Sequence, residues 1–204
     1  MKLYEMATTP SCRRVNIFLK LLGVEPERVT VDVRSGENLS SHYRNISANL
    51  KVPLLEIDDD THLCESVAIC RYVDAITPNQ LYLFGRSPLE MAQVEMWQRM
   101  VELQGLMPAF QAFRNLSGVY RDRETCIELW GEESKKRVAA FLPVLEQQLA
   151  KHRYVAGSDL TIADISAFVF IKVCENALQL PVIGHYPNIS AWLQELQQHD
   201  GFSA

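Results

Sequence analysis

The stretch that decides the fold is residues 51–69, KVPLLEIDDDTHLCESVAI, which combines a strand, a tight turn and the start of a helix. Its strand begins at Pro53, and a proline at that position cannot donate a hydrogen bond to a neighbouring strand. Because X–Pro bonds at such bends are the usual place for a cis peptide, we expect a cis bond between Val52 and Pro53. That bond would turn the Val52 N–H and C=O outward, where they could pair with the peptide groups of a ligand.

The helix that follows opens with Glu65 and Ser66. These residues offer a carboxylate, a hydroxyl and the unpaired N–H groups of a helix N-terminus, which favour an anion. A plain helix cap would have the same sequence, and one geometry can serve both purposes. Together with Val52, the three positions suit a small zwitterionic peptide. Its carboxylate would lie at the helix end, its ammonium at Glu65 and its amide against Val52.

The segments around this stretch complete an α/β unit. We predict strands at Lys2–Met6 and Val29–Val33 with a helix between them, and a short helix at 40–46. A tight turn of three aspartates makes the strand at His62–Cys64 antiparallel to Pro53–Ile57. The order β-α-β-α-β-β-α, with a right-handed first crossover, predicts a mixed four-stranded sheet with flanking helices.

Beyond residues 77–88, which contain two prolines and a glycine, the sequence predicts helices and no strand. We therefore expect an α/β domain at 1–78, a linker at 79–87 and an all-helical domain at 88–204. The first expected helix is a long one over 88–114 that bends near Pro108, and a second follows at 138–149. A capping box at Thr161–Asp164 opens a buried helix that continues through Cys174, and a last helix lies around 189–196.

Composition excludes several classes of protein. The chain has 204 residues, 48% hydrophobic and 22% charged, with a net charge of −5, which disfavours a nucleic-acid partner. It has no apolar run long enough to span a membrane, and Met1–Glu5 turns polar too soon for a signal peptide. Five cysteines without a CxxC pair indicate a reducing cytoplasm, and five histidines without ligand spacing predict no metal site.

Four segments in this order resemble the cytosolic glutathione transferase family: TTPSCRRV at 8–15, KVP at 51–53, ESVAI at 65–69 and the capping box at Thr161–Asp164. The resemblance covers essentially the whole chain, and the first loop is most similar to bacterial theta-like and nu-like members. It implies a thioredoxin-like first half that binds glutathione, and an all-helical second half that supplies most of the pocket for an electrophile. It also implies a homodimer.

The resemblance places the sulfur-activating residue in the first loop. The family uses a Tyr, Ser or Cys before the first helix, and counting back from Arg13 puts Thr9 at that position. The Thr9 or Ser11 hydroxyl could donate a hydrogen bond to the bound sulfur and favour the thiolate. Thr9 could instead only cap the helix. Cys12 is a rival because it lies beside two arginines, although a small packed side chain is the favoured interpretation.

Other site residues also follow from the resemblance. In related classes, the positions of Asn38 and Lys51 hold the glycine carboxylate of glutathione, although Ser47-Ala48 stands where Asn-Pro is usual. The remaining expected contacts to glutathione come from Arg13, Val52, Pro53, Glu65 and Ser66, and those to the electrophile from Met107, Phe110, Phe113 and Arg114.

These observations predict a glutathione transferase with glutathione as its co-substrate. It would stabilise the glutathione thiolate for attack on an apolar electrophile. The alternatives are a glutathione-dependent disulfide or peroxide reductase and a non-catalytic protein that binds glutathione or another ligand.

Overall fold

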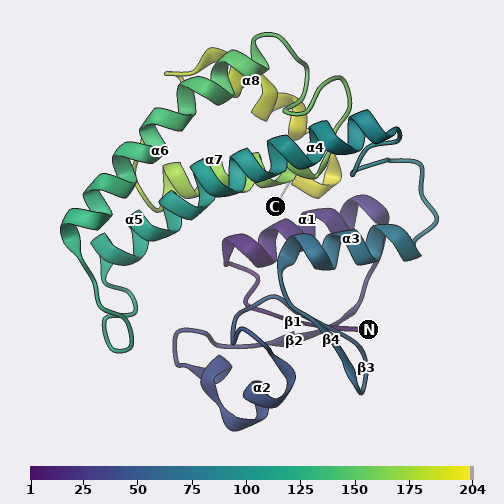
Figure 1. The fold of residues 1–204 in the computed structure, drawn as a ribbon, viewed down its shortest axis with the longest axis vertical. Helices are drawn as coiled ribbons and strands as arrows, with labels where there is room; N and C mark the ends of the chain where they lie inside the picture. The colour runs from purple at the N-terminus through teal and green to yellow at the C-terminus, as the bar shows by residue number, and fades with distance from the viewer. Residues whose placement is uncertain (203–204) are drawn as a thin grey trace. The chain divides into compact units, whose positions relative to one another are not determined.

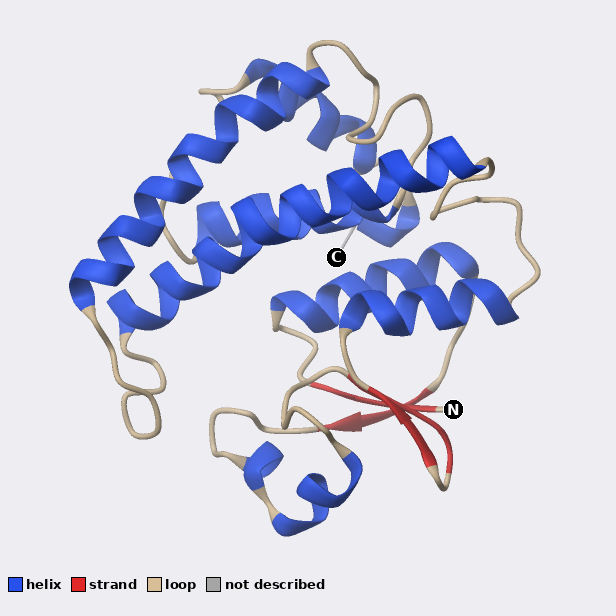
Figure 2. Cartoon of the chain, viewed as in Figure 1, coloured by secondary structure: helices blue, strands red, loops and turns tan. Residues whose placement is uncertain are grey.

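The computed structural model describes residues 1–202, which form two compact units (Figures 1 and 2). The first unit consists of Met1–Leu81 and the described residues that follow Gln198, and the second consists of Tyr82–Gln198. Among the described residues, no helix has both the length and the apolar character that a bilayer crossing requires.

The first unit contains a four-stranded sheet in the order β2-β1-β3-β4. Strand β1 is parallel to β2, and β3 is antiparallel to β4, as predicted. Strand β1 is also antiparallel to β3, which places it between β2 and β3. Helices α1 and α3 lie side by side over one face of the sheet, and α2 lies at the other (Figure 1). The element bounds are β1 Lys2–Glu5, α1 Pro10–Leu22, β2 Glu27–Thr30, α2 Ser41–Ile46, β3 Leu54–Asp58, β4 Thr61–Leu63 and α3 Ser66–Ile76. Short 3₁₀ turns lie at Glu37–Leu39 and Asp200–Phe202.

Strand β2 begins and ends earlier than predicted. The alternation of β-branched residues predicts Val29–Val33, whereas the strand runs from Glu27 to Thr30. The Val31 N–H still bonds to the Glu5 carbonyl at 2.8 Å, but the Asp32 carboxylate then accepts the N–H groups of Arg34 and Ser35. The Asp32 N–H, which a longer strand would need, instead bonds to the Glu37 carboxylate at 2.7 Å, so the strand ends before it.

The second unit is helical. Its helices are α4 Pro88–Met100, a π-helical segment Val101–Leu106, α5 Met107–Ser117, α6 Glu128–Leu149, α7 Ile162–Asn176 and α8 Pro187–Leu196. Helix α7 is the buried centre of this unit, as predicted, because the side chains on every side of it are buried.

The irregularity in the long helix comes before Pro108. The six residues Val101–Leu106 are π-helical, and the Met107 N–H bonds to the Glu102 carbonyl five residues earlier. Pro108 has no N–H to continue the ordinary ladder. Gly105 lies so close to α6 and α7 that a Cβ there would come within 3.2 Å of the Phe141 and Phe170 rings.

The predicted capping box opens α7. The Asp164 carboxylate is fully buried and accepts hydrogen bonds from the Thr161 N–H at 2.9 Å and the Thr161 hydroxyl at 3.1 Å. It also accepts the Val155 N–H at 2.8 Å and the Trp192 indole N–H at 3.0 Å. Burial raises the pKa of this carboxyl to about 6, although its donors favour the ionised form.

Candidate functional site

The peptide bond between Val52 and Pro53 is cis, as predicted. Pro53 is buried and Val52 is half-buried at the end of the segment that enters β3. Within residues 1–202, neither the N–H nor the C=O of Val52 forms a hydrogen bond with the protein. This backbone unit is therefore available to an extended ligand, which could pair with it as a neighbouring strand would.

Two buried side chains hold the segment that carries Lys51. The buried Tyr43 hydroxyl donates to the Lys51 carbonyl at 2.8 Å, and the buried Asn38 amide donates to the Leu50 carbonyl at 2.6 Å. The Leu50 N–H bonds to the Ser47 hydroxyl at 3.1 Å, and Leu50 has a φ of +55°. Asn38 thus contacts the loop itself, while the Lys51 side chain is exposed.

Glu65 has an unusual backbone conformation. Its φ of +68° with a ψ of 116° is rare for a residue with a side chain, and such outliers concentrate at functional sites. It precedes α3, and its exposed carboxylate accepts a hydrogen bond from the Asn49 amide at 2.9 Å. The predicted ammonium-binding carboxylate is therefore tied to the loop before β3 by the Asn49 amide.

Ser66 is buried at the first position of α3, where its hydroxyl accepts a hydrogen bond from the Arg14 guanidinium at 2.8 Å. Arg14 is itself only 5% exposed, so a cation lies behind the start of this helix. A cation and a helix N-terminus both favour a carboxylate nearby. From the sequence we predict a glutathione contact at Arg13 and assign no role to Arg14. The buried Ile17 and Phe18, at i+3 and i+4, nevertheless place position 14 on the inner face of α1.

The start of α1 carries two hydroxyls in different settings. Thr9 is the N-cap residue by its backbone angles, but its side chain makes no capping hydrogen bond. The Thr9 hydroxyl oxygen is buried and has no hydrogen-bond partner of standard geometry in the described chain. Ser11 is half-buried in the first turn, where a helix leaves its N–H groups unpaired.

Cys12 is fully buried, and burial raises the pKa of its thiol to about 11. The nearby Thr9 hydroxyl and the Met6 backbone lower that pKa only in part. At neutral pH the thiol therefore stays protonated, and it is a poor nucleophile. This setting supports the packed side chain over the reactive one.

The expected electrophile contacts lie on α5 in the second unit. Met107 is 50% exposed, and Phe110, Phe113 and Arg114 are half-buried. Three of the four, at positions 107, 110 and 114, share one side of the helix. The Arg114 guanidinium donates to the Glu124 carboxylate and stacks over a tyrosine ring, so it also holds the loop that follows α5.

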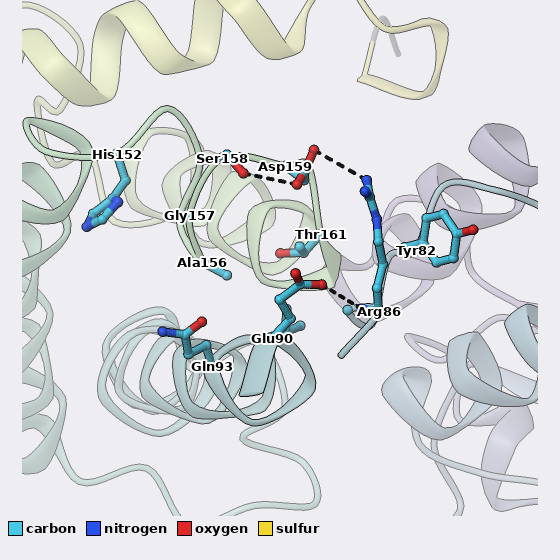
Figure 3. A pocket seen from close by; sticks show the side chains of 12 residues that line it. Tyr82, Arg86, Glu90, Gln93, His152, Ala156, Gly157, Ser158, Asp159 and Thr161 are labelled. Atoms are coloured by element: carbon cyan, nitrogen blue, oxygen red, sulfur yellow. Dashed lines mark hydrogen bonds and ion pairs between the residues drawn. The ribbon is translucent and has the colours of Figure 1, made fainter. Parts of the chain in front are cut away.

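The second unit also contains a small polar cavity of about 250 Å³ beside the start of α4 (Figure 3). Most of its polar groups pair with one another: Arg86 approaches Asp159 at 3.7 Å, and the Glu90 carboxylate accepts the Arg86 N–H at 2.9 Å. None of the residues expected to contact the electrophile lines this cavity.

In the described part of the chain, no group of three or more His, Cys, Asp or Glu side chains is arranged to hold a metal ion.

Comparison with known proteins decides the family. The glutathione S-transferase N-terminal domain matches residues 8–76, and the glutathione S-transferase C-terminal domain matches residues 130–200. Glutathione S-transferase F10 of Arabidopsis thaliana is 30% identical over 194 residues, which are 91% of this chain and 87% of the relative. The chain belongs to the glutathione S-transferase family.

Solved structures agree with this assignment for our glutathione S-transferase. A class Gtt2 glutathione S-transferase of Vibrio parahaemolyticus is 52% identical with a TM-score of 0.90, covering 100% of this chain and 96% of that one. Gtt2 from Saccharomyces cerevisiae is 25% identical with a TM-score of 0.92, covering 100% and 99%. The expected family, fold class and transferase enzyme are confirmed.

Proposed function

We propose that this glutathione S-transferase binds glutathione in its first unit and joins the glutathione sulfur to an apolar electrophile. The observation that carries the proposal is the unpaired Val52 backbone, together with the fixed Glu65 carboxylate at the start of α3. In the bound tripeptide, the cysteinyl amide would pair with Val52, and the γ-glutamyl end would lie at Glu65 and Ser66. Lys51, on the same loop as Val52, would attract the glycine carboxylate.

The chemical step needs a thiolate at neutral pH. A free thiol has a pKa of about 8.5, and helix N-termini and nearby cations lower it. The unpaired N–H groups in the first turn of α1 and the Ser11 hydroxyl supply such stabilisation without rearrangement. The Thr9 hydroxyl would have to turn out of its buried position to help. The thiolate then forms the carbon–sulfur bond as the leaving group takes away the electron pair of the bond that breaks.

The electrophile would lie against Met107 and Phe110 on one side of α5, with Phe113 at the edge of that side. The exposed and half-buried apolar surface of these residues suits a ligand without charge. Holding the two reactants in a reactive orientation would supply most of the rate acceleration.

Glutathione-dependent reduction of disulfides or peroxides is the second candidate. The high pKa of the buried Cys12 thiol disfavours a route through a mixed disulfide on that residue. A route in which one glutathione attacks the disulfide and a second resolves the product needs no protein thiol, and it would use the same site.

The test combines binding with turnover. We expect glutathione to raise the melting temperature in a concentration-dependent way. A panel of aryl halides, epoxides, disulfides and peroxides then identifies the reaction. Turnover of disulfides or peroxides alone would favour the reductase, and binding without any turnover would favour a binding protein. An unchanged melting temperature at millimolar glutathione would contradict the transferase, the reductase and the glutathione-binding protein alike.

We also propose a cytoplasmic homodimer, as family resemblance implies. The five free cysteines suit a reducing compartment. Light scattering after size exclusion measures the assembly directly, and a mass of one chain at micromolar concentration would contradict the dimer.

A further inference from the structure

One side chain, Asn49, joins the two elements that would bind opposite ends of the tripeptide. Its Nδ2 donates to Glu65 Oε1 at 2.9 Å, and its Oδ1 accepts the Lys51 N–H at 3.1 Å. Lys51 belongs to the loop before β3, and Glu65 lies at the start of α3. We infer that Asn49 is a positioning residue that sets the spacing between the carboxylate-binding and ammonium-binding groups. This inference rests on the proposed function.

Further hydrogen bonds surround the contacts of Asn49 with Lys51 and Glu65. The Ser47 hydroxyl approaches Asn49 Oδ1 at 3.4 Å and accepts the Leu50 N–H, so the turn over residues 47–51 closes on itself. The Tyr43 hydroxyl fixes the Lys51 carbonyl on the other side. The loop is thereby rigid internally, and the Asn49 amide is the side chain that ties this turn to Glu65.

Glu65 needs such a tie. Its left-handed φ of +68° is unfavourable for a glutamate and persists only where surrounding contacts hold it. The Asn49 hydrogen bond holds the carboxylate end of that residue, and the Glu65 carbonyl accepts the Ile69 N–H as the first bond of α3. A tripeptide anchored at Glu65 therefore meets Lys51 at a fixed distance, whereas a dipeptide without the glycine gains nothing from that spacing.

The positioning role of Asn49 must be distinguished from a purely local role in the turn. The Oδ1–Lys51 bond alone is an Asx turn, which asparagine forms in many loops. Aspartate at position 49 would keep that acceptor but lose the donor to Glu65 and place two carboxylates together. Serine would also keep an acceptor, without adding charge.

Asn79 provides a matched control in the same unit. Its Oδ1 accepts the Leu81 N–H at 3.0 Å, and its Nδ2 approaches the Asp74 carboxylate at 3.3 Å. Asn79→Asp thus makes the same chemical change in a turn of the same kind. It lies after α3, away from the residues assigned to glutathione.

The experiment measures dissociation constants of the full chain and its variants for glutathione and for γ-glutamylcysteine, by calorimetry at low salt. For Asn49→Ser we expect about fivefold weaker glutathione binding, since a partly exposed hydrogen bond to a charged group is lost. For Asn49→Asp we expect glutathione binding to weaken about tenfold or more, because the new carboxylate also repels the Glu65 carboxylate. In both variants, the preference for glutathione over the dipeptide should shrink.

Melting temperatures and amide exchange at Lys51 separate positioning from folding. We expect Asn49→Asp to keep the Lys51 N–H protected and to melt within a few degrees of Asn79→Asp, which itself binds glutathione like the unchanged protein. Equal affinity of Asn49→Asp and the unchanged protein, or an equal loss for both ligands, would overturn the inference while leaving the proposed function intact. If the unchanged protein binds neither ligand, the proposed function fails and this inference fails with it.

Discussion

At the residue scale, the two hydroxyls at the start of α1 differ in what they can reach. The Thr9 oxygen is buried without a partner of standard geometry in the described chain, whereas Ser11 is half-buried in the first turn. A buried hydroxyl without a hydrogen bond costs free energy that a methyl group of the same shape does not. Counting back from Arg13 favours Thr9, whereas the burial of its hydroxyl favours Ser11, and we therefore predict Ser11 as the sulfur contact.

Ser11→Ala should lower kcat/KM by about 10- to 100-fold, because one charge-assisted hydrogen bond to the thiolate is lost. Thr9→Val should change it less than about threefold and should raise the free energy of unfolding, since it keeps the shape and removes a buried hydroxyl that has no partner of standard geometry in the described chain. Steady-state kinetics and the pH dependence of the thiolate absorbance measure both effects. A larger loss in Thr9→Val would instead identify Thr9 as the sulfur contact.

Arg14 is the residue with the largest expected effect on the start of α3. Arg14→Met should lower the free energy of unfolding by about 1–3 kcal/mol and weaken glutathione binding, because it leaves the buried Ser66 hydroxyl without its donor. Lys20→Met, on the exposed side of α1, is the control and should stay within about 0.5 kcal/mol. Urea unfolding and calorimetry check this, and equal behaviour of the two variants would contradict a role for Arg14.

At the element scale, the start of α7 depends on one buried carboxylate. Asp164, in the first turn of α7, accepts hydrogen bonds from the N-cap residue Thr161, from the segment before it and from α8, so it joins three parts of the second unit. Its fourth hydrogen bond, from the Thr161 hydroxyl, completes the capping box. This network explains why a local motif matters for tertiary packing.

Asp164→Ala should destabilise the protein by about 3 kcal/mol or more, because several buried donors lose their acceptor at once. Leu129→Ala, on an 83% exposed side chain of α6, is the control and should change stability little. Chemical unfolding with urea measures both. A loss below about 1 kcal/mol for Asp164→Ala would contradict the role of the network.

Asp164 also predicts a pH dependence. Its pKa is raised from 3.8 to about 6 in the folded protein, so the folded state binds the extra proton between these values. Its contribution to stability is fully present below about pH 4 and is lost as the pH rises through 6. The stability of the unchanged protein relative to Asp164→Asn should therefore fall across this window, as unfolding at a series of pH values would show. A constant difference would contradict the raised pKa.

At the scale of the whole molecule, the proposed function assigns separate roles to the two units. The residues assigned to glutathione all lie within Met1–Leu81, and those assigned to the electrophile all lie within Tyr82–Gln198. Each unit has its own buried core, with the sheet and α1 in one and α7 in the other. In this proposal, each unit of the chain binds one of the two reactants.

Hydrogen exchange should show this division. Glutathione alone should slow exchange in segments 9–15, 47–53 and 65–70, because bound ligand reduces local opening there. A glutathione conjugate with an apolar group should extend the protection to α5. Mass spectrometry measures both, and α7, already buried, is the internal control. Protection by glutathione confined to the second unit would contradict the assignment.

Much of this fold is predictable because its signals are local. The helical repeats, the cis Val52–Pro53 bond, the capping box and the mixed sheet follow from residues close in sequence, and all are present. The end of β2 differs because the Glu37 carboxylate, five residues further on, accepts the Asp32 N–H that a longer strand would need. The π-helical segment differs because close packing at Gly105 and the missing N–H of Pro108 act together.

The family and the order of the elements can be read from the residues alone, since motifs and periodicity are properties of short segments. Packing had to be seen to show that Arg14 turns inward, that Asn49 reaches Glu65 and that the Thr9 hydroxyl is buried. Arg14 and Ser66 are 52 residues apart, and Asn49 and Glu65 are 16 apart. Such partners meet only when the chain packs, so no pattern within a single segment can identify them.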